Sequence, residues 1–330
     1  MTDVPDGVPT ARTATAPATA PAHAPAPDPG SDPGPPPSRA RRVGTFGTLW
    51  RGMAMGLADV VPGVSGGTVA LLVGIYPRLI AALAALTGAT TWRALVDRRW
   101  IAAWRAVDGA FLGTLVLGIA LSVVSAAGLV EAALEAYRPW VYAAFFGLVA
   151  ASGVVVLRLV RTRGPVQVTA FVATAILATV LVGLAPTTTP DAAWFLALAG
   201  AIGICALVLP GISGAFLLVL LGQYERVIGA IASADLATLV PFALGAGIGL
   251  LGFARLLARW LRHAPDTTHA VLAGFLFGSL RRVWPWQGDE TLRLTLHGPP
   301  DPLAAAGASA LALAAFLAVL TLAAWEHRTR

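Results

Sequence analysis

Apolar residues recur in ten long runs along this chain, separated by short polar connections. By residue number the runs are 43–61, 64–86, 110–133, 140–157, 166–186, 192–209, 212–232, 238–261, 268–283 and 303–325. A helix needs about 20 apolar residues to cross the hydrocarbon core of a bilayer, and most of the runs are close to that length. The pattern therefore predicts an all-α integral membrane protein.

Two of the gaps between runs are very short and contain helix breakers. Val-Pro-Gly-Val-Ser at residues 61–65 separates the first two runs, and Pro-Gly-Ile at residues 210–212 separates the sixth from the seventh. Proline removes a backbone donor and clashes with the preceding turn, while glycine reaches backbone angles that other residues avoid. Each pair of runs is either two helices that meet at a tight break or a hairpin that enters the membrane and returns.

The two breaks belong to an internal repeat. VVPGVSGGTVALLVGIYPRLIA at residues 60–81 aligns with VLPGISGAFLLVLLGQYERVIG at residues 208–229, at a constant offset of 148. The alignment keeps proline, glycine, serine, tyrosine and arginine, which rarely coincide by chance in apolar sequence. Residues 142–152 resemble residues 269–279 at a shorter offset, so the first copy contains an insertion, most naturally in the arginine-rich connection 87–109.

Each copy then contains a broken pair at Pro-Gly-x-Ser-Gly and three further transmembrane helices. An odd number of spans places two copies in opposite orientations, so we predict two inverted repeats, as in many transporters. A parallel repeat is the alternative, if one run in each copy does not span. We expect the first membrane repeat at residues 39–186 and the second at residues 187–330.

Composition agrees with a lipid environment. The chain is 57% hydrophobic and only 12% charged, whereas soluble domains carry about a quarter charged residues. Residues 1–38 differ, because they are rich in proline and alanine and contain no apolar run. Such a segment cannot bury enough apolar surface to fold, so we predict a disordered cytoplasmic tail rather than a signal peptide.

The 23 basic residues are all arginines, and they lie mostly between the apolar runs. Clusters precede the first run, occupy the connection 87–109, follow the fourth run, end the eighth and close the chain. If each broken pair returns to its starting side, these clusters share one face, which the positive-inside rule makes cytoplasmic together with both termini. Arg281, Arg282 and Arg293 fall on the other face and do not fit this topology.

Other ligand classes find little support in the sequence. The arginines form no patch with interleaved aromatic residues, so nucleic acid is not an expected partner. Cys205 is the single cysteine, and the five histidines show no metal-binding spacing. We therefore expect no metal, no cofactor and no catalytic residue.

The duplicated motif is the candidate site. The serine after each break is placed to cap the following half-helix, whose unpaired N–H groups and partial positive charge attract phosphate or carboxylate. Two such ends could face one central cavity. The alternative is that the motif is only a tight connection, with its glycines serving helix packing. The candidate substrate-binding residues are Asp59, Gly63, Ser65, Gly66, Gly67, Arg78, Gly211, Ser213, Gly214 and Arg226.

Charged and aromatic residues beside the breaks have several interpretations. Asp59 is a carboxylate inside an apolar run, which is costly unless it is paired or hydrated. It is a candidate proton carrier, arginine partner or helix cap. Arg78 and Arg226 suit a phosphate because a guanidinium binds two oxygens at once, although they also suit the membrane interface. Tyr76 and Tyr224 are expected to anchor at that interface.

The stretch GMAMGLADVVPGVSGGTVALLVGIY at residues 52–76 resembles a bacterial polytopic family, first known as a domain of unknown function and linked to undecaprenyl phosphate translocation. LVLPGISGAFLLVLLGQYERVIGAI at residues 207–231 is similar to that family's second motif. The resemblance covers about residues 44–325. The family often has Tyr-Glu-Arg after both motifs, but here the first copy reads Tyr76-Pro77-Arg78, so a role for two symmetric glutamates is in doubt.

The resemblance implies transport of the C55 lipid carrier undecaprenyl phosphate across the bacterial plasma membrane, for reuse in cell-envelope synthesis, through two re-entrant hairpins. An anionic polyprenyl phosphate and membrane lipids are the implied partners. The residues alone leave open a secondary transporter of a small soluble anion. A membrane enzyme that cleaves a lipid phosphate is a further alternative, but the sequence shows no nucleophile arrangement for it.

Overall fold

The computed structural model describes residues 44–60, 64–184, 186, 189–190, 192–287 and 296–328, without the side chains of Ala127, Glu131 and residues 325–328. The predicted tail and the candidate site residue Gly63 lie outside the described residues. The helices are α1 (Thr45–Val60), α2 (Gly66–Leu72), α3 (Tyr76–Ala85), α4 (Ala89–Val96), α5 (Trp100–Ala106), α6 (Gly109–Arg158), α7 (Pro165–Leu181), α8 (Ala193–Val208), α9 (Gly214–Leu220), α10 (Tyr224–Ser233), α11 (Leu236–His263), α12 (Pro265–Ser279), the 3-10 helix η1 (Leu280–Val283) and α13 (Pro302–Arg328).

This is a multi-pass membrane protein built from helices, as the apolar pattern predicted. Among the described residues, four helical stretches are long and apolar enough to cross a bilayer, namely Gly109–Ala126, Ala132–Arg158, Leu236–His263 and Pro302–Ala324. Two more spans are possible if each bent pair counts as one: α2 and α3 meet at 118°, and α9 and α10 at 108°. Helices α7 and α8 are apolar but shorter.

The helices depart from the predicted runs in two places. The third and fourth runs form the single helix α6, which bends at Tyr137, where φ is −136° and ψ is 32°. Pro139 lies two residues after the bend. Proline lacks a backbone N–H and clashes with the preceding helical turn, which accounts for the bend. The arginine-rich connection 87–109, for which no helix was predicted, carries the two short helices α4 and α5.

The repeat seen in the sequence recurs in the bounds of the helices. Helices α8, α9 and α10 begin and end 148 residues after α1, α2 and α3. Gly74 and Gly222 follow the two short helices with φ of 68° and 64°, a conformation that favours glycine. Helix α11 begins 127 residues after α6, and Ala264 (φ −141°) follows Tyr137 at the same interval. The α4–α5 segment therefore accounts for the change of offset.

Equivalent glycines also pack the two copies in the same way. A side chain at Gly118 of α6 would collide with the Leu49 carbonyl of α1, and a side chain at Gly245 of α11 would collide with the Ala197 carbonyl of α8. Small residues allow helix backbones to approach this closely, which gives van der Waals contact without a hydrophobic driving force in lipid. Each copy is thus built on a tightly packed pair, α1 with α6 and α8 with α11.

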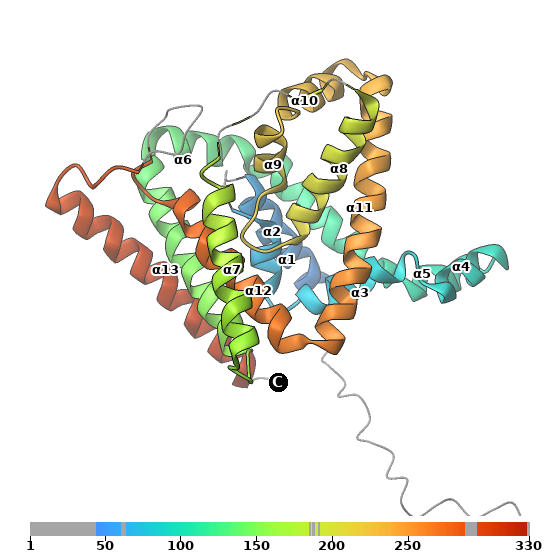
Figure 1. The fold of residues 1–330 in the computed structure, drawn as a ribbon, viewed down its shortest axis with the longest axis horizontal. Helices are drawn as coiled ribbons and strands as arrows, with labels where there is room; N and C mark the ends of the chain where they lie inside the picture. The colour runs from blue at the N-terminus through green and yellow to red at the C-terminus, as the bar shows by residue number, and fades with distance from the viewer. Residues whose placement is uncertain are drawn as a thin grey trace, which may run out of the picture. The chain divides into compact units, whose positions relative to one another are not determined.

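The last helix of each copy crosses over to the other copy. Helix α7 follows α6 in the chain but packs against α12, and α13 follows α12 but packs against α6 (Figure 1). Thr174 of α7 donates to the Val271 carbonyl of α12 at 3.2 Å. A side chain at Gly147 of α6 would collide with the Ala312 carbonyl of α13. The two copies are therefore interlocked, and the buried core lies around the first broken pair, with residues of α6, α11 and α12 packed against it.

Candidate functional site

The two Pro-Gly-x-Ser-Gly turns contact each other. Ser65 Oγ of the first motif donates to the Leu209 carbonyl at 3.3 Å, and Gly211 N of the second motif donates to Thr68 Oγ1 at 3.0 Å. Tyr76 Oη, at the start of α3, donates to the Val208 carbonyl at 3.1 Å. These carbonyls end α8, where the break leaves them without helical partners. Side chains of the first copy thus satisfy the broken backbone of the second.

Both ends of α2 are bound by charged side chains of α1. Gly66 N donates to Asp59 Oδ1 at 2.5 Å, and Gly67 N donates to Ser65 Oγ at 3.2 Å. At the other end, Arg51 Nε donates to the carbonyl of Val73 at 3.1 Å. An acid at a helix N-terminus and a base at its C-terminus both match the helix dipole. Of the roles considered for Asp59, the structure shows the helix cap.

The second motif repeats the serine cap but not the charged pair. Ser213 precedes α9 and accepts a hydrogen bond from Phe216 N at 3.4 Å. Ala199 and Leu207 occupy the positions equivalent to Arg51 and Asp59. Gly211 has a φ of 88°, which explains glycine at this turn. Helix α9 therefore lacks the side chains that bind the ends of α2.

The two helix ends also differ in exposure. Ser65 is 1% exposed, and Gly66 and Gly67 are buried. Ser213 is half-buried and Ala215 is exposed. Side chains at Gly66 and Gly214 would collide with the Asp59 carboxylate and the Gly203 carbonyl, so these glycines serve close packing as well. In this conformation the first motif is closed and the second is the more accessible.

The predicted arginines lie at the starts of α3 and α10, each near an aspartate. Arg78 binds Asp108, with Nε–Oδ2 and Nη2–Oδ1 distances of 2.7 and 3.1 Å, and its guanidinium lies 4.2 Å from the centre of the Phe111 ring. Arg226 occupies the equivalent place in α10, and its positive charge interacts with Asp235. Hydrogen bonds from Thr238 and Ala237, together with the charge of Arg226, hold the pKa of Asp235 below its ordinary value.

Three residues near the motifs were missed or misread in the sequence. Tyr76 is 1% exposed and bonds across the two copies, so the prediction of an interface anchor was wrong for this tyrosine. Thr68 was not identified, because a threonine in an apolar helix carries no distinctive signal. The guanidinium of Arg282 lies 4.9 Å from the centre of the ring of Phe216, a residue in the first turn of α9. The buried Nε of Arg282 has no hydrogen-bond partner among the described residues. The sequence did single out Arg282 in one respect, because the predicted topology placed it on the face opposite the arginine clusters.

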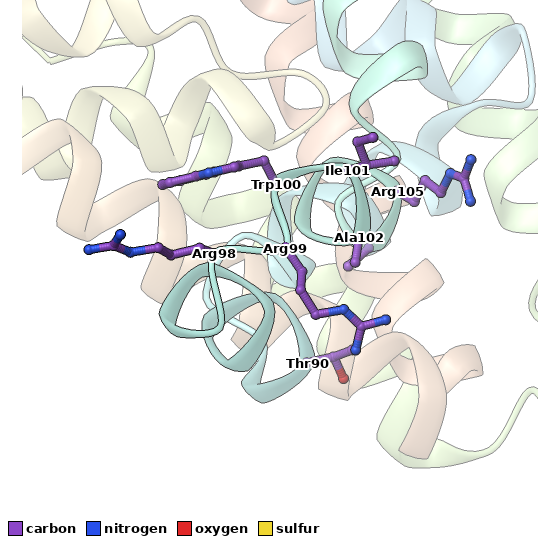
Figure 2. Close-up of a pocket in the computed structure, with 8 residues that line it drawn as sticks. Thr90, Arg98, Arg99, Trp100, Ile101, Ala102 and Arg105 are labelled. Carbon is purple, nitrogen blue, oxygen red and sulfur yellow. The ribbon is translucent and has the colours of Figure 1, made fainter.

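Two cavities lie among the described residues, and neither is lined by Ser65 or Ser213. One of about 120 Å³ lies beside the α2–α3 turn, where Gly74, Tyr76 and Pro77 face His269. Another, of about 730 Å³, is open and lies between α4 and α5, away from both motifs (Figure 2). Among the described residues, no three His, Cys, Asp or Glu side chains are grouped to bind a metal. The two motifs are thus held together by hydrogen bonds, with Ser65 buried and Ser213 half-buried.

Broken helices that meet in pairs inside a bundle of membrane helices are a feature of many membrane transporters. A family model described as undecaprenyl phosphate translocase-like matches residues 55–299, a span that includes both motifs. A polyprenyl-phosphate transporter of Vibrio cholerae serotype O1 is 36% identical over 258 residues, covering 78% of this chain and 83% of that protein. One of Staphylococcus aureus is 30% identical over 253 residues, covering 71% and 84%. No solved structure matches the chain.

The chain belongs to the undecaprenyl phosphate translocase-like family. This confirms the resemblance inferred from the two motifs.

Proposed function

We propose that this protein transports undecaprenyl phosphate across the bacterial plasma membrane, so that the lipid carrier returns for another round of cell-envelope synthesis. Family membership, with two relatives named polyprenyl-phosphate transporters, is the observation that carries this proposal. It does not favour a soluble anion as the substrate. No Gly-x-x-x-x-Gly-Lys-Ser/Thr motif for ATP occurs in the sequence, so transport is driven by a gradient or by mass action.

We further propose that the two copies are inverted, with boundaries near residues 39–186 and 187–330. The positions of equivalent elements support this arrangement. Helix α10 lies near one end of the bundle and its counterpart α3 near the other, and the bend of α6 lies opposite the α11–α12 junction (Figure 1). Inverted copies allow one binding site to open to either side of the membrane in turn.

The proposed topology places both termini in the cytoplasm. Contacts at one end of the bundle support it, because they join segments from different arginine clusters. The backbone N–H groups of Arg161 and Thr162 donate to the Asp266 carboxylate, and Arg255 donates to the Thr87 carbonyl. By the positive-inside rule, a face that gathers so many arginines is cytoplasmic.

The proposed path for the phosphate runs between the two motifs. Ser65, Gly66 and Gly67 on one side, and Gly211, Ser213 and Gly214 on the other, supply hydroxyl and N–H donors once the turns separate. Gly63 belongs to this set by its place in the motif. Separation of the turns breaks the Thr68–Gly211 hydrogen bond and frees Gly211 N for the anion. Gly66 N becomes available only when Asp59, which belongs to the same motif, releases it.

Arginines at three places would neutralise the phosphate as it moves. Arg282 lies beside α9, at the more accessible motif, while Arg78 and Arg226 lie at the starts of α3 and α10. Donors and positive charge lower the cost of bringing an anionic headgroup into a low-dielectric region. The isoprenoid tail stays in the lipid, so that only the headgroup crosses the protein.

Flipping of a fluorescent polyprenyl phosphate in proteoliposomes tests the proposal. We expect the purified protein to expose the lipid to a quencher or phosphatase on the opposite leaflet, and the Ser65→Ala/Ser213→Ala double variant to be slower but normally inserted. Uptake of soluble anions without lipid flipping would support the alternative transporter, and release of inorganic phosphate from the lipid would identify an enzyme.

A further inference from the structure

Helices α4 and α5 form a hairpin that occurs only in the first copy. In the second copy, α10 is followed by Ala234, Asp235 and then α11, whereas in the first copy α4 and α5 lie between α3 and α6. The paired motifs do not need this hairpin, because the second copy forms its own broken pair without an equivalent. An added element of this kind calls for a role of its own.

The hairpin is a defined structure attached at both ends. Thr91 Oγ1 donates to the Ala85 carbonyl at 2.7 Å, which fixes α4 to the end of α3. Arg99 N donates to the Ala94 carbonyl at 2.8 Å across the turn between the helices. Thr91, Ala94 and Ala103 are buried where the two helices meet. These contacts use few of the hairpin's large side chains.

The outer surface of the hairpin combines large apolar residues with arginines. Five apolar side chains are each more than half exposed: Trp92, Val96, Trp100, Ile101 and Trp104. Four exposed arginines are interleaved with them: Arg93, Arg98, Arg99 and Arg105. Asp97 is the one acidic residue of this segment. Tryptophan concentrates at the headgroup level of membranes, and arginine beside it binds anionic lipid headgroups.

The directions of the arginine side chains indicate whether the hairpin binds one anion or a broad layer of headgroups. Arg98, Arg99 and Arg105 line the open cavity of about 730 Å³, but their side chains point in three different directions (Figure 2). Guanidinium groups that diverge cannot enclose a single phosphate. They suit contact with several headgroups spread over a flat surface.

The place of the hairpin favours the surrounding lipid over a soluble partner. It projects sideways from the helices rather than along them, starting from the end of α3 (Figure 1). A lateral projection from a membrane-embedded bundle meets neighbouring lipids. Arg255 of α11 contacts Thr87 just before α4, so the projection begins at the arginine-rich end.

We propose that the α4–α5 hairpin lies in the headgroup layer of the arginine-rich face and binds anionic phospholipids there. This inference rests on the protein's being embedded in a membrane and does not depend on which molecule is transported. The tryptophans and Ile101 enter the interface between headgroups and acyl chains, while the arginines contact the phosphates. Binding of this kind fixes the depth of the first copy and raises the local concentration of anionic lipid beside it.

Hydrogen exchange of the full-length protein tests this proposal without any substitution. The protein is compared in phosphatidylcholine nanodiscs with and without phosphatidylglycerol. We expect amides of residues 89–106 to exchange about tenfold more slowly with the anionic lipid, since each arginine at the surface contributes appreciably to lipid binding. Equal exchange in the two lipids would overturn the electrostatic part of the proposal.

A triple arginine variant and a labelled cysteine variant of the hairpin make the test more specific. Arg98→Gln/Arg99→Gln/Arg105→Gln should lose the effect of phosphatidylglycerol, whereas the matched triple Arg158→Gln/Arg161→Gln/Arg163→Gln should keep it. A fluorophore on Ile101→Cys, in a Cys205→Ala background, should be quenched by lipids brominated near the headgroup. A fluorophore quenched only by aqueous iodide would place the hairpin in water and favour a protein partner. Either result is separate from lipid flipping, so failure here leaves the proposed transport function intact.

Discussion

Gly211 of the second motif donates its backbone N–H to the hydroxyl of Thr68, a residue of the first motif's short helix, at 3.0 Å. The two residues are 143 positions apart in the chain, and both are buried. This bond joins the two broken pairs at the point where the proposed transport path requires them to separate. The first motif is therefore held closed by contacts with the second copy as well as by its own hydrogen bonds.

Loss of the Thr68 hydroxyl should destabilise the protein. Thr68→Val keeps the shape of the side chain but leaves the buried Gly211 N–H without its acceptor, which costs about 1–3 kcal/mol. Thr114→Val is the matched control, since the Thr114 hydroxyl makes an exposed hydrogen bond within α6, and it should change stability by less than about 0.5 kcal/mol. Thermal unfolding in detergent measures both. Equal melting temperatures for the two variants would contradict the buried bond.

Asp59 should couple transport to protons, if the carboxylate must take up a proton to leave Gly66 N. Lipid flipping by the unsubstituted protein should then respond to a pH difference across the liposome membrane, and Asp59→Asn should flip without that response. Asp301→Asn is the control, because Asp301 caps α13 through Ala304 N in the same manner. An unchanged pH response in Asp59→Asn would leave Asp59 as a helix cap alone.

Exchange of the Arg78–Asp108 pair separates its structural role from a role in binding. The side chains of Arg78 and Asp108 are 34% and 40% exposed, so losing the pair through Arg78→Gln should cost only about 0.2–1 kcal/mol. Arg78→Asp/Asp108→Arg should recover only part of that stability, because Asp108 has a φ of 52°, which suits aspartate better than arginine. Flipping should stay slow because an aspartate at position 78 repels phosphate. Full recovery of flipping would show that Arg78 only holds α3 against α6.

Glycine packing between α8 and α11 predicts opposite effects for two neighbouring substitutions. Gly245→Ala collides with the Ala197 carbonyl and should destabilise the protein by about 1–3 kcal/mol. Gly247→Ala, on the same helix, meets nothing within 4 Å and should raise stability by up to about 1 kcal/mol through helix propensity. Melting temperatures of the two variants decide. A stable Gly245→Ala protein would mean that the helices are not so close.

Much of the fold follows from local sequence, because lipid imposes a simple rule on composition. A segment without polar residues must be a helix in the bilayer, so the ten apolar runs correspond to helices, and Pro-Gly steps mark the breaks. The sequence repeat at an offset of 148 residues correctly indicated that α8, α9 and α10 recur with the same lengths as α1, α2 and α3. The predicted serine caps at Ser65 and Ser213 follow from the same local chemistry.

The sequence by itself determined which long apolar segments are helical, where the Pro-Gly breaks lie and which family the chain resembles, because these depend on local composition and motif alone. Only the tertiary structure decided how the breaks are satisfied. A broken helix must find partners for its free N–H and C=O groups, but any nearby hydroxyl or carboxylate can serve, and no local pattern selects one. The roles of Thr68, Tyr76 and Asp59, the Arg78–Asp108 pair and the α4–α5 hairpin all depend on distant segments meeting in space.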